Sequence, residues 1–377
     1  MAPAHHFHSS SHSSFNVGFN ASVGRRRALQ LAALAGAAFA GGGLGGCSRQ
    51  EPAGRLLSVR GVLPAAWLQE LPSDWRADPL ASPEAVLAAA VRPHETSAQL
   101  LALGDGWAQR LDRSQLQPFA APALLAQLDA RAQSASRLFA SPGAAALAYP
   151  WAFGTWLLLL RSRSDLWQRR EQGWDLLLDP SLRGRLVLPS SPRVVIDLAC
   201  RQLGLPGGTA AAVDDPRLPD QLRRLVGQAV ALDEVDGLNL LLAGDAEAAV
   251  LPSHRVIPLL QSDPRLQALL PASGSPLWWQ LLLRPSPMSA LAADPPLPLA
   301  WLRQGLELPL LDRLLAGGWV PPLPRARLQP ALARWPERLR ALLLPPEAVL
   351  QRCSNLEAFS PSEQQRWQQL WDRALAQ

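Results

Sequence analysis

Short apolar runs alternate with amphipathic stretches along the chain from residue 55 onward. The first run predicts a strand at 55–59, and a helix is predicted after it at 65–71. Similar short runs follow at 100–103, 185–188, 230–232, 248–251 and 277–283. Since strands that alternate with helices usually pair in one direction, the pattern predicts an α/β architecture with parallel sheets.

The run at 144–160 is longer and contains the stretch A-Y-P-W-A-F-G-T-W-L-L-L-L. It predicts one or two buried strands interrupted by a turn around 151–155. After the run at 185–188, Ser190-Ser191-Pro192 predicts a helix start, with serine as N-cap and proline at the first helical position. Gly204 predicts the end of that helix.

The last stretch of the chain predicts an amphipathic helix that packs on the body of the protein. Ser360 and Glu363 around Pro361 form a capping box at its start. The apolar side chains predicted to share one face are Trp367, Leu370, Trp371 and Leu375.

Length and composition suit two domains, or one large α/β body, with a sizeable core, because 48% of the 377 residues are apolar. All 36 basic residues are arginine. Without residues 1–46 there remain 33 arginines against 31 acids, a net charge of +2. This balance excludes the strongly basic surface that nucleic-acid binding requires.

Residues 1–46 have the anatomy of an export signal. Three arginines at 25–27 precede an apolar stretch at 28–40 that is too short and rich in glycine to span a bilayer. The consecutive arginines resemble a twin-arginine signal in part, and the general secretory route stays open. Leu44-Gly45-Gly46-Cys47 resembles the lipobox of bacterial lipoproteins, in which the cysteine carries diacylglycerol. We therefore expect Cys47 to anchor the mature protein, through lipid only, to the periplasmic side of a bacterial membrane.

Histidines and the remaining cysteines suggest little chemistry. His5, His6, His8 and His12 are either a metal tract or part of an n-region discarded with the signal, and only His94 and His254 follow. A histidine metal cluster in the mature chain is therefore not expected, nor is any cofactor. Cys200 and Cys353 either form a disulfide or leave Cys200 as a buried free thiol.

Five ordered segments resemble the spermidine/putrescine-binding branch of the extracellular solute-binding proteins of ABC importers. They are A-Y-P-W-A-F-G-T-W at 148–156, W-D-L-L-L-D-P-S-L-R-G-R-L-V-L-P at 174–189, L-L-A-G-D-A-E-A-A-V at 241–250, G-S-P-L-W-W-Q at 274–280 and A-G-G-W-V-P-P-L-P at 316–324. The resemblance implies the two-lobed α/β fold of type II periplasmic binding proteins, with a ligand cleft between the lobes. The implied lobes are 47–155 with 281–315, and 156–280 with 316–377.

The resemblance also implies function. A protein of this kind is a monomer that captures a small polar solute, most often a polyamine, and delivers it to an ABC permease by closing its lobes. Such a protein is not an enzyme. Ligand-binding side chains are expected outside the carboxyl ends of the strands. The candidates are Asp105, Trp107, Trp151, Phe153, Thr155, Ser190, Ser191, Arg193, Asp233, Glu234, Asp236, Ser253, Arg255, Trp278 and Gln280.

Polyamine binders surround the ligand with aromatic rings and carboxylates, because both stabilise an ammonium. The resemblance places Trp278 on a wall of this box, and Trp151 or Phe153 supplies another wall unless these rings only fill the core. Several acids of the family pattern are missing. The turn at 190–194 reads S-S-P-R-V, and Gln280 stands where a carboxylate is expected.

Other residues offer substitutes for the missing acids. Asp233, Glu234 and Asp236 either face the cleft or form a solvated loop and helix cap. Asp105, in the glycine-containing loop 104–107 before a helix at Trp107, is another candidate, although turn chemistry also explains it. Alternatively, Ser190 and Ser191 with the helix N–H groups, assisted by Arg193 and Arg255, suit an anionic or polar neutral ligand. An iron(III) site built from tyrosines is not expected, because Tyr149 is the sole tyrosine.

Two other classes compete with transport. An enzyme lacks support, because Ser253 and His254 are expected on opposite faces of a strand and the chain contains no nucleophile elbow or phosphate loop. A sensor or scaffold lipoprotein on the same fold is the alternative that the missing acids suggest.

Overall fold

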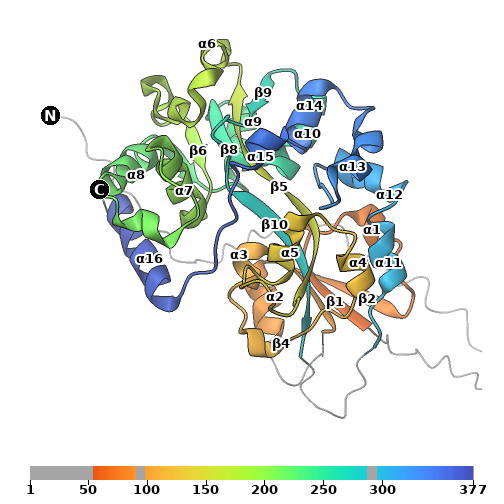
Figure 1. Cartoon of the computed structure of the whole chain (residues 1–377). Coiled ribbons are helices and arrows are strands. Elements are labelled where there is room, and N and C mark those ends of the chain that lie inside the picture. The colour runs from red at the N-terminus through yellow and green to blue at the C-terminus, as the bar shows by residue number, and fades with distance from the viewer. Residues whose placement is uncertain (1–53, 91–97, 287–294, 377) are drawn as a thin grey trace, which may run out of the picture. The chain divides into compact units, whose positions relative to one another are not determined.

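The computed structural model describes residues 54–90, 98–286 and 295–376 (Figure 1). The export signal, the lipobox with Cys47, the N-terminal histidines and His94 lie outside the described residues. None of the described helices is long and apolar enough to cross a membrane.

Strands and helices alternate as the sequence predicts. The strands are β1 (Gly54–Val59), β2 (Trp75–Leu80), β3 (Leu100–Gly104), β4 (Leu116–Gln117), β5 (Ala148–Arg161), β6 (Leu186–Leu188), β7 (Ala229–Leu232), β8 (Ala248–Pro252), β9 (Leu266–Leu269) and β10 (Leu277–Pro285). The α-helices of the first part are α1 (Ala65–Leu68), α2 (Pro83–Ala90), α3 (Asp105–Ala108), α4 (Pro122–Leu125), α5 (Ala130–Ser136), α6 (Ser164–Gln168), α7 (Pro192–Gln202) and α8 (Leu218–Val226). Those that follow are α9 (Gly237–Ala243), α10 (Ser253–Ser262), α11 (Leu299–Gln304), α12 (Leu310–Ala316), α13 (Arg325–Leu332), α14 (Glu337–Leu343), α15 (Glu347–Leu350) and α16 (Pro361–Leu375). Short 3₁₀ turns stand at η1 (Arg113–Gln115), η2 (Arg170–Leu178), η3 (Pro180–Leu182) and η4 (Ala210–Asp214).

The strands form one sheet in the order β2-β1-β3-β10-β5-β8-β6-β7, with β4 paired to β10 and β9 to β5. The prediction of parallel pairing is correct for β1 with β2 and β3, and for β6 with β7 and β8. It is wrong at the centre, where β10 and β5 pair antiparallel with each other and with their outer neighbours β3, β8 and β9. The sheet is therefore mixed, because the chain runs through β5 and β10 against the direction of the flanking strands.

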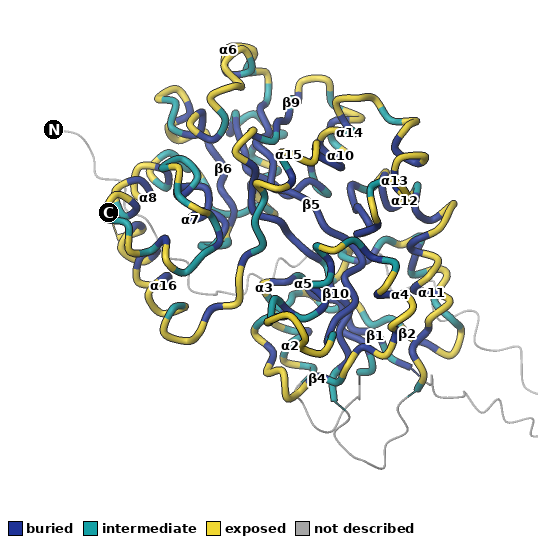
Figure 2. The backbone as a smooth tube through the Cα atoms, viewed as in Figure 1, coloured by how far each residue is buried: buried dark blue, intermediate teal, exposed yellow. Residues whose placement is uncertain are grey.

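Strand β5 connects two halves of this sheet. Residues 148–155 pair with β10, whereas residues 156–161 pair with β8 and β9. We call β1–β4, β10 and residues 148–155 the first half, and β6–β9 with residues 156–161 the second half. Residues 148–160 of β5 and nearly all of β10 are buried, so the middle of the sheet is the centre of the core (Figure 2).

The turn predicted around 151–155 is not present, because β5 is one continuous strand of 14 residues. Pro150 fits within the strand beside an irregularity in the register between Gln280 and Leu281 of β10. Gly154 serves close packing rather than a turn, since a Cβ there would overlap Ser253 Oγ and the Trp278 ring. Both turn-forming residues are thus accommodated by the neighbouring strand and helix.

Helix boundaries follow local chemistry with two corrections. Helix α7 begins at Pro192 and ends before Gly204, whose φ is +71°. The helix predicted at 65–71 ends at Leu68, in keeping with Leu71 preceding Pro72, a position that disfavours helical backbone. The helix predicted to resume at Trp107 already begins at Asp105, which lies in its first turn.

The C-terminal helix α16 packs against α8 and α7, as expected (Figure 1). Ser360 and Glu363 form the predicted capping box. Trp367, Leu370 and Trp371 are buried, but Leu375 is 45% exposed and Ala374 takes its place in the interface. The prediction for Leu375 is wrong because a position seven residues after Trp367 stays on the buried face better than one eight residues after it.

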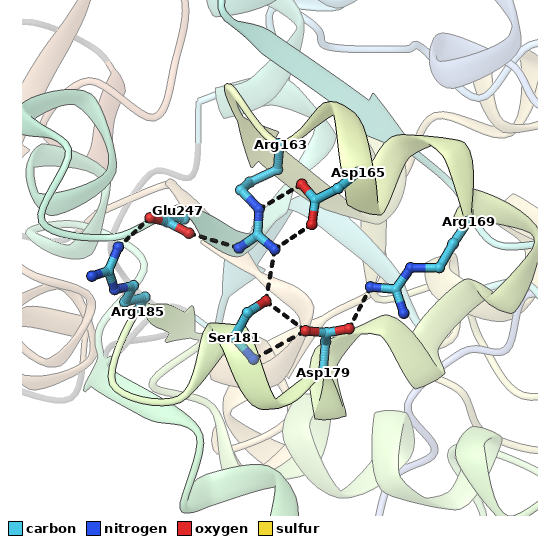
Figure 3. Close-up of polar contacts among 7 residues, drawn as sticks. All are labelled: Arg163, Asp165, Arg169, Asp179, Ser181, Arg185 and Glu247. Atoms are coloured by element: carbon cyan, nitrogen blue, oxygen red, sulfur yellow. Dashed lines mark hydrogen bonds and ion pairs between the residues drawn. The ribbon is translucent and has the colours of Figure 1, made fainter.

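An ion-pair network joins the end of β5 to the beginnings of β6 and β8 (Figure 3). Arg163 contacts Glu247 at 2.6 Å and Asp165 at 2.6 Å, and its guanidinium also donates to Ser181 Oγ at 2.6 Å. Arg185 holds the other oxygen of Glu247, and Asp179 links Ser181 to Arg169 (Figure 3). Because Arg163 bonds to three partners, the network fixes this edge of the second half.

Cys200 and Cys353 are both free thiols. Cys200 is fully buried in α7, which agrees with the alternative of a buried free thiol. Burial raises the pKa of the Cys200 thiol to about 12, so it stays protonated and unreactive at neutral pH.

Candidate ligand-binding site

The candidate residues gather where several strands end and the next helices begin. Strands β3, β6, β7 and β8 are followed within a few residues by α3, α7, α9 and α10. Trp278 of β10 lies opposite Gly154 of β5, and Gln280 lies opposite Gly104 at the end of β3. The carboxyl ends of strands from both halves therefore meet the middle of β5 and the start of β10, the place where ligands bind in open α/β sheets.

Asp105 is the acid most deeply placed at this edge. Its side chain is 8% exposed and accepts hydrogen bonds from the backbone N–H groups of Trp279 and Gly106, while Oδ2 accepts no hydrogen bond. Burial raises the pKa of Asp105 to about 6, and the N–H groups and the nearby charge of Arg193 limit the rise. A buried carboxylate oxygen without a donor is costly, which marks Asp105 as a group prepared for a ligand.

Gln280 and Trp107 are the neighbours of Asp105. The Gln280 side chain approaches Gly104, and its Oε1 is buried without a hydrogen-bond donor. Trp107 is half-buried and lies under the guanidinium of Arg110, with 4.7 Å between Cζ and the ring centre. Asp105 Oδ2 and Gln280 Oε1 thus present two free acceptors on adjoining strands.

Arg193, in the first turn of α7, reaches from the second half of the sheet to the first. It donates to Gln109 Oε1 at 3.1 Å and to the Glu357 carbonyl, and its guanidinium lies 4.2 Å from the centre of the Phe359 ring. Gln109 follows Asp105 by one helical turn. Asp105 and Arg193 are therefore brought together, although they lie far apart in the sequence.

Glu234 occupies the helix start that sequence analysis offered to an anion. Its Oε2 accepts the Ser190 N–H at 2.7 Å, and Arg255 donates to the Glu234 carbonyl at 3.4 Å. The Ser191 side chain makes no capping hydrogen bond to α7. A carboxylate of the chain itself thus takes one of the N–H groups proposed for a ligand.

The other two acids after β7 behave as loop residues. Asp233 Oδ1 accepts the N–H groups of Val235 at 2.7 Å and Asp236 at 3.2 Å. Asp236 is exposed and stands directly before α9. Of the three acids, Glu234 is the one that the fold joins to other candidate residues.

The aromatic candidates pack on one another. Trp278 is 6% exposed, meets His254 and Trp319 edge to face at 4.7 and 5.5 Å, and donates Nε1–H to the Thr155 carbonyl at 3.2 Å. Trp151 is 2% exposed and lies against Trp319 at 5.1 Å. Phe153 belongs to a separate pair, stacked on Trp279 at 5.2 Å. In this structure these rings fill the core.

Two hydroxyls beside these rings have no partner. Ser253 and Thr155 are each 1% exposed, and neither Oγ atom forms a hydrogen bond. Ser253 and His254 were expected on a strand, but they begin α10 instead. Burial and the charge of Arg255 lower the pKa of His254 to about 3, so the ring is neutral where it stacks on Trp319 at 4.1 Å.

Sequence reasoning missed four residues at this edge: Gln109, His254 as a packing partner, Trp319 and Phe359. Trp319 stands in the segment 316–324 that carried the resemblance, which is a signal for a site position. Gln109 and Phe359 contact Arg193 through the fold alone, and no motif around them indicates this.

Neither of the two surface hollows that we describe is lined by a candidate residue. One, of about 580 Å³, is bounded by Leu178, Arg183, Asp220, Arg223, Arg224, Gly227 and Gln228. The other is bounded by Pro219, Arg223, Leu370, Arg373, Ala374 and Ala376. The described residues also contain no group of three or more His, Cys, Asp or Glu side chains arranged to hold a metal ion.

No family model matches the chain, and no curated protein matches it. Solved structures do match. The spermidine/putrescine ABC transporter substrate-binding protein PotD from Streptococcus pneumoniae superposes with a TM-score of 0.67 at 14% identity, covering 85% of this chain and 98% of that one. The lipoprotein TpPotD of Treponema pallidum gives a TM-score of 0.62 at 14% identity, with 85% and 98% covered.

A periplasmic thiamin-binding protein gives a TM-score of 0.58 at 12% identity, covering 86% of this chain and 96% of that one. The chain therefore has the α/β fold of periplasmic solute-binding proteins over most of its length. These neighbours are named for different ligands, so the similarity shows the fold and the ligand has to be argued from the site.

Proposed function

We propose that the chain is the solute-binding component of an ABC importer, which captures a small amine-bearing solute at the edge formed by α3, α7 and β10 and delivers it to a permease. The fold provides the scaffold. The single observation that carries the proposal is Asp105, a buried carboxylate whose Oδ2 has no donor. At neutral pH this group lies above its pKa of about 6 and is negatively charged.

An ammonium is the ligand group that suits these atoms. It donates up to three hydrogen bonds, and Asp105 Oδ2 and Gln280 Oε1 are free acceptors on neighbouring strands. A simple anion at the start of α7 is disfavoured, because Glu234 already accepts the Ser190 N–H there. A polyamine remains the first candidate, in keeping with two of the similar structures.

Calorimetric titration with spermidine and putrescine tests the proposal. We expect binding to the purified full chain and its loss in Asp105→Asn, which keeps the shape of the side chain but not its charge. Asp236→Asn is the matched control, because Asp236 is exposed and makes no capping hydrogen bond to α9. Absence of binding to spermidine, putrescine and a broader set of amines contradicts the proposal.

A sensor or scaffold without transport is the second candidate function. The observation in its favour is that Trp278, Trp151 and Trp319 pack against each other, where a polyamine box would leave ring faces for the ligand. Neighbouring permease and ATPase genes would favour transport, and an isolated gene would favour this alternative. Neither candidate involves catalysis.

The proposed setting is that of an exported, monomeric lipoprotein. Residues 1–46 supply the export signal and Cys47 the lipid that holds the protein to the periplasmic side of the membrane. The lobes proposed for closure are 47–155 with 281–315 and 156–280 with 316–377. The sheet partners of β5 change between Thr155 and Trp156, which supports this division.

A further inference from the structure

Asp105 and Arg193 bring opposite charges to the same place from the two halves of the sheet. Asp105 begins α3 after β3, and Arg193 lies in the first turn of α7 after β6. The guanidinium is close enough for its positive charge to act on the Asp105 carboxylate. The hydrogen bond from Arg193 to Gln109, one turn after Asp105, fixes this placement.

Each of the two groups keeps one hydrogen-bonding atom unused. Asp105 Oδ2 is a buried acceptor without a donor, and Arg193 Nε is a buried donor without an acceptor. Among the described residues the two side chains form no hydrogen bond with each other, although both remain charged at neutral pH. An acceptor of negative charge and a donor of positive charge are therefore both available at one site.

The surrounding charges are already engaged. Asp197 also acts on Arg193, but it is bound by Arg201 at 2.6 Å. Glu357 also acts on Arg193, but its side chain is exposed to solvent. The other groups that hold Asp105 are backbone N–H groups, which carry no net charge. The site is thus close to neutral overall, with one full charge of each sign.

We propose that this site selects a zwitterion, an amino acid whose ammonium binds Asp105 Oδ2 and whose carboxylate binds Arg193. This inference rests on the proposed function and narrows its ligand class. A purely cationic solute is attracted by Asp105 but repelled by Arg193, and a purely anionic solute meets the reverse. A ligand with both charges satisfies both unused atoms and joins α3 to α7, which belong to different halves of the sheet.

Three compounds with the same four-carbon chain test the charge preference. Putrescine carries two positive charges, 4-aminobutyrate carries one of each sign, and succinate carries two negative charges. L-Alanine adds a zwitterion with the two charges closer together. In calorimetric titrations of the full chain, we expect at least one zwitterion to bind about tenfold more tightly than putrescine and succinate.

Two variants turn the preference into a readout that a structural role would not move. Arg193→Gln keeps a polar side chain without the charge, and we expect it to favour putrescine over the zwitterion. Asp105→Asn is expected to favour succinate. Arg110→Gln is the matched control, because Arg110 is exposed over Trp107 near the end of α3, and its selectivity should equal that of the wild type.

Folding of each variant is checked by circular dichroism and thermal unfolding. If Arg193→Gln does not fold, Arg193→Met replaces it, since its apolar chain still packs on Phe359, and Arg193→Lys should restore the wild-type preference. Putrescine or succinate binding as tightly as both zwitterions overturns the inference, as does unchanged selectivity in a folded Arg193 variant. If putrescine or spermidine is the tight ligand, the proposed function stands and this inference falls. If no compound binds, both fall.

Discussion

Trp67 and Trp301 donate their indole N–H groups to each other's backbone carbonyls, at 3.0 and 2.7 Å, while their rings stack 4.4 Å apart. Both side chains are 1% exposed, and Trp151 of β5 lies against the Trp67 ring at 5.2 Å. The pair therefore ties α1 and α11, 234 residues apart in the chain, to the central strand.

Replacing Trp301 by phenylalanine should lower the free energy of unfolding by about 2 kcal/mol. The change removes the N–H donor to the buried Trp67 carbonyl and part of the stacked ring. Chemical denaturation of the variant measures the loss. Trp335→Phe is the control, because Trp335 is only half-buried and should lose clearly less. Equal losses in the two variants would show that the reciprocal bonds contribute nothing beyond ring size.

Asp105→Asn should make the protein more stable at pH 7 and have little effect below pH 4. The pKa of Asp105 lies at about 6 in the folded chain, above its ordinary value of 3.8, so burial penalises the ionised form. The wild type therefore loses stability as the pH rises from about 4 to 6, and the variant does not. The shift corresponds to about 3 kcal/mol as an upper bound.

Urea denaturation of wild type and Asp105→Asn across pH 4 to 7 checks this expectation. The difference in free energy of unfolding should grow with pH through this window and then level off. A difference that is independent of pH would mean that Asp105 does not titrate in this range.

Gly154→Ala should destabilise the fold by about 2 kcal/mol or more, because the new methyl group overlaps Ser253 Oγ and the Trp278 ring in the centre of the core. Gly106→Ala is the matched control, since nothing lies within 4 Å of its Cβ position and its backbone is helical. Thermal unfolding compares the two. A Gly154→Ala variant as stable as wild type would mean that β5 and β10 can separate at little cost.

Trp278→Ala should weaken ligand binding more than tenfold and also lower the free energy of unfolding by about 4 kcal/mol. The second effect follows from its burial among Trp319, His254 and the Thr155 carbonyl. Binding is therefore titrated at a temperature where the variant is fully folded. Trp167→Ala, which alters a half-buried ring in α6, is the control for general destabilisation. Unchanged affinity would remove Trp278 from the site.

Cys47→Ser should abolish lipid attachment and block processing of the precursor. The thiol of the lipobox is the atom to which diacylglycerol is transferred, and serine does not replace it. Palmitate labelling of cells that express wild type or variant provides the measurement. Cys353→Ser is the control, since Cys353 lies outside the lipobox and should leave labelling intact. Normal labelling of Cys47→Ser would refute the lipoprotein assignment.

Local patterns predicted most of the elements correctly because their causes are local. The helix at Pro192–Gln202 is set by its own proline and Gly204, and α16 by its capping box. The antiparallel centre and the unbroken β5 were missed because they depend on partners distant in sequence. Pro150 and Gly154 look like turn residues until β10 and α10 pack beside them.

The site was predictable in its location but only partly in its chemistry. The ends of β3, β6, β7 and β8 were identified from apolar runs, and they do carry Asp105, Ser190, Glu234 and Ser253. The partners were not predictable, since Arg193 meets Gln109 and Phe359 only through the fold. The aromatic residues show the same limit, because a sequence does not reveal whether a ring faces a ligand or another ring.

The continuity of β5 has a mechanical consequence. Its backbone is hydrogen-bonded to β10 up to Thr155 and to β8 from Trp156 onward, with no flexible residue between. Any rotation of one half against the other must therefore be absorbed as torsion along this strand, which resists it as a stiff spring does. Opening would then store elastic energy that drives the return, so the amplitude and rate of the motion depend on strand stiffness rather than on linker length.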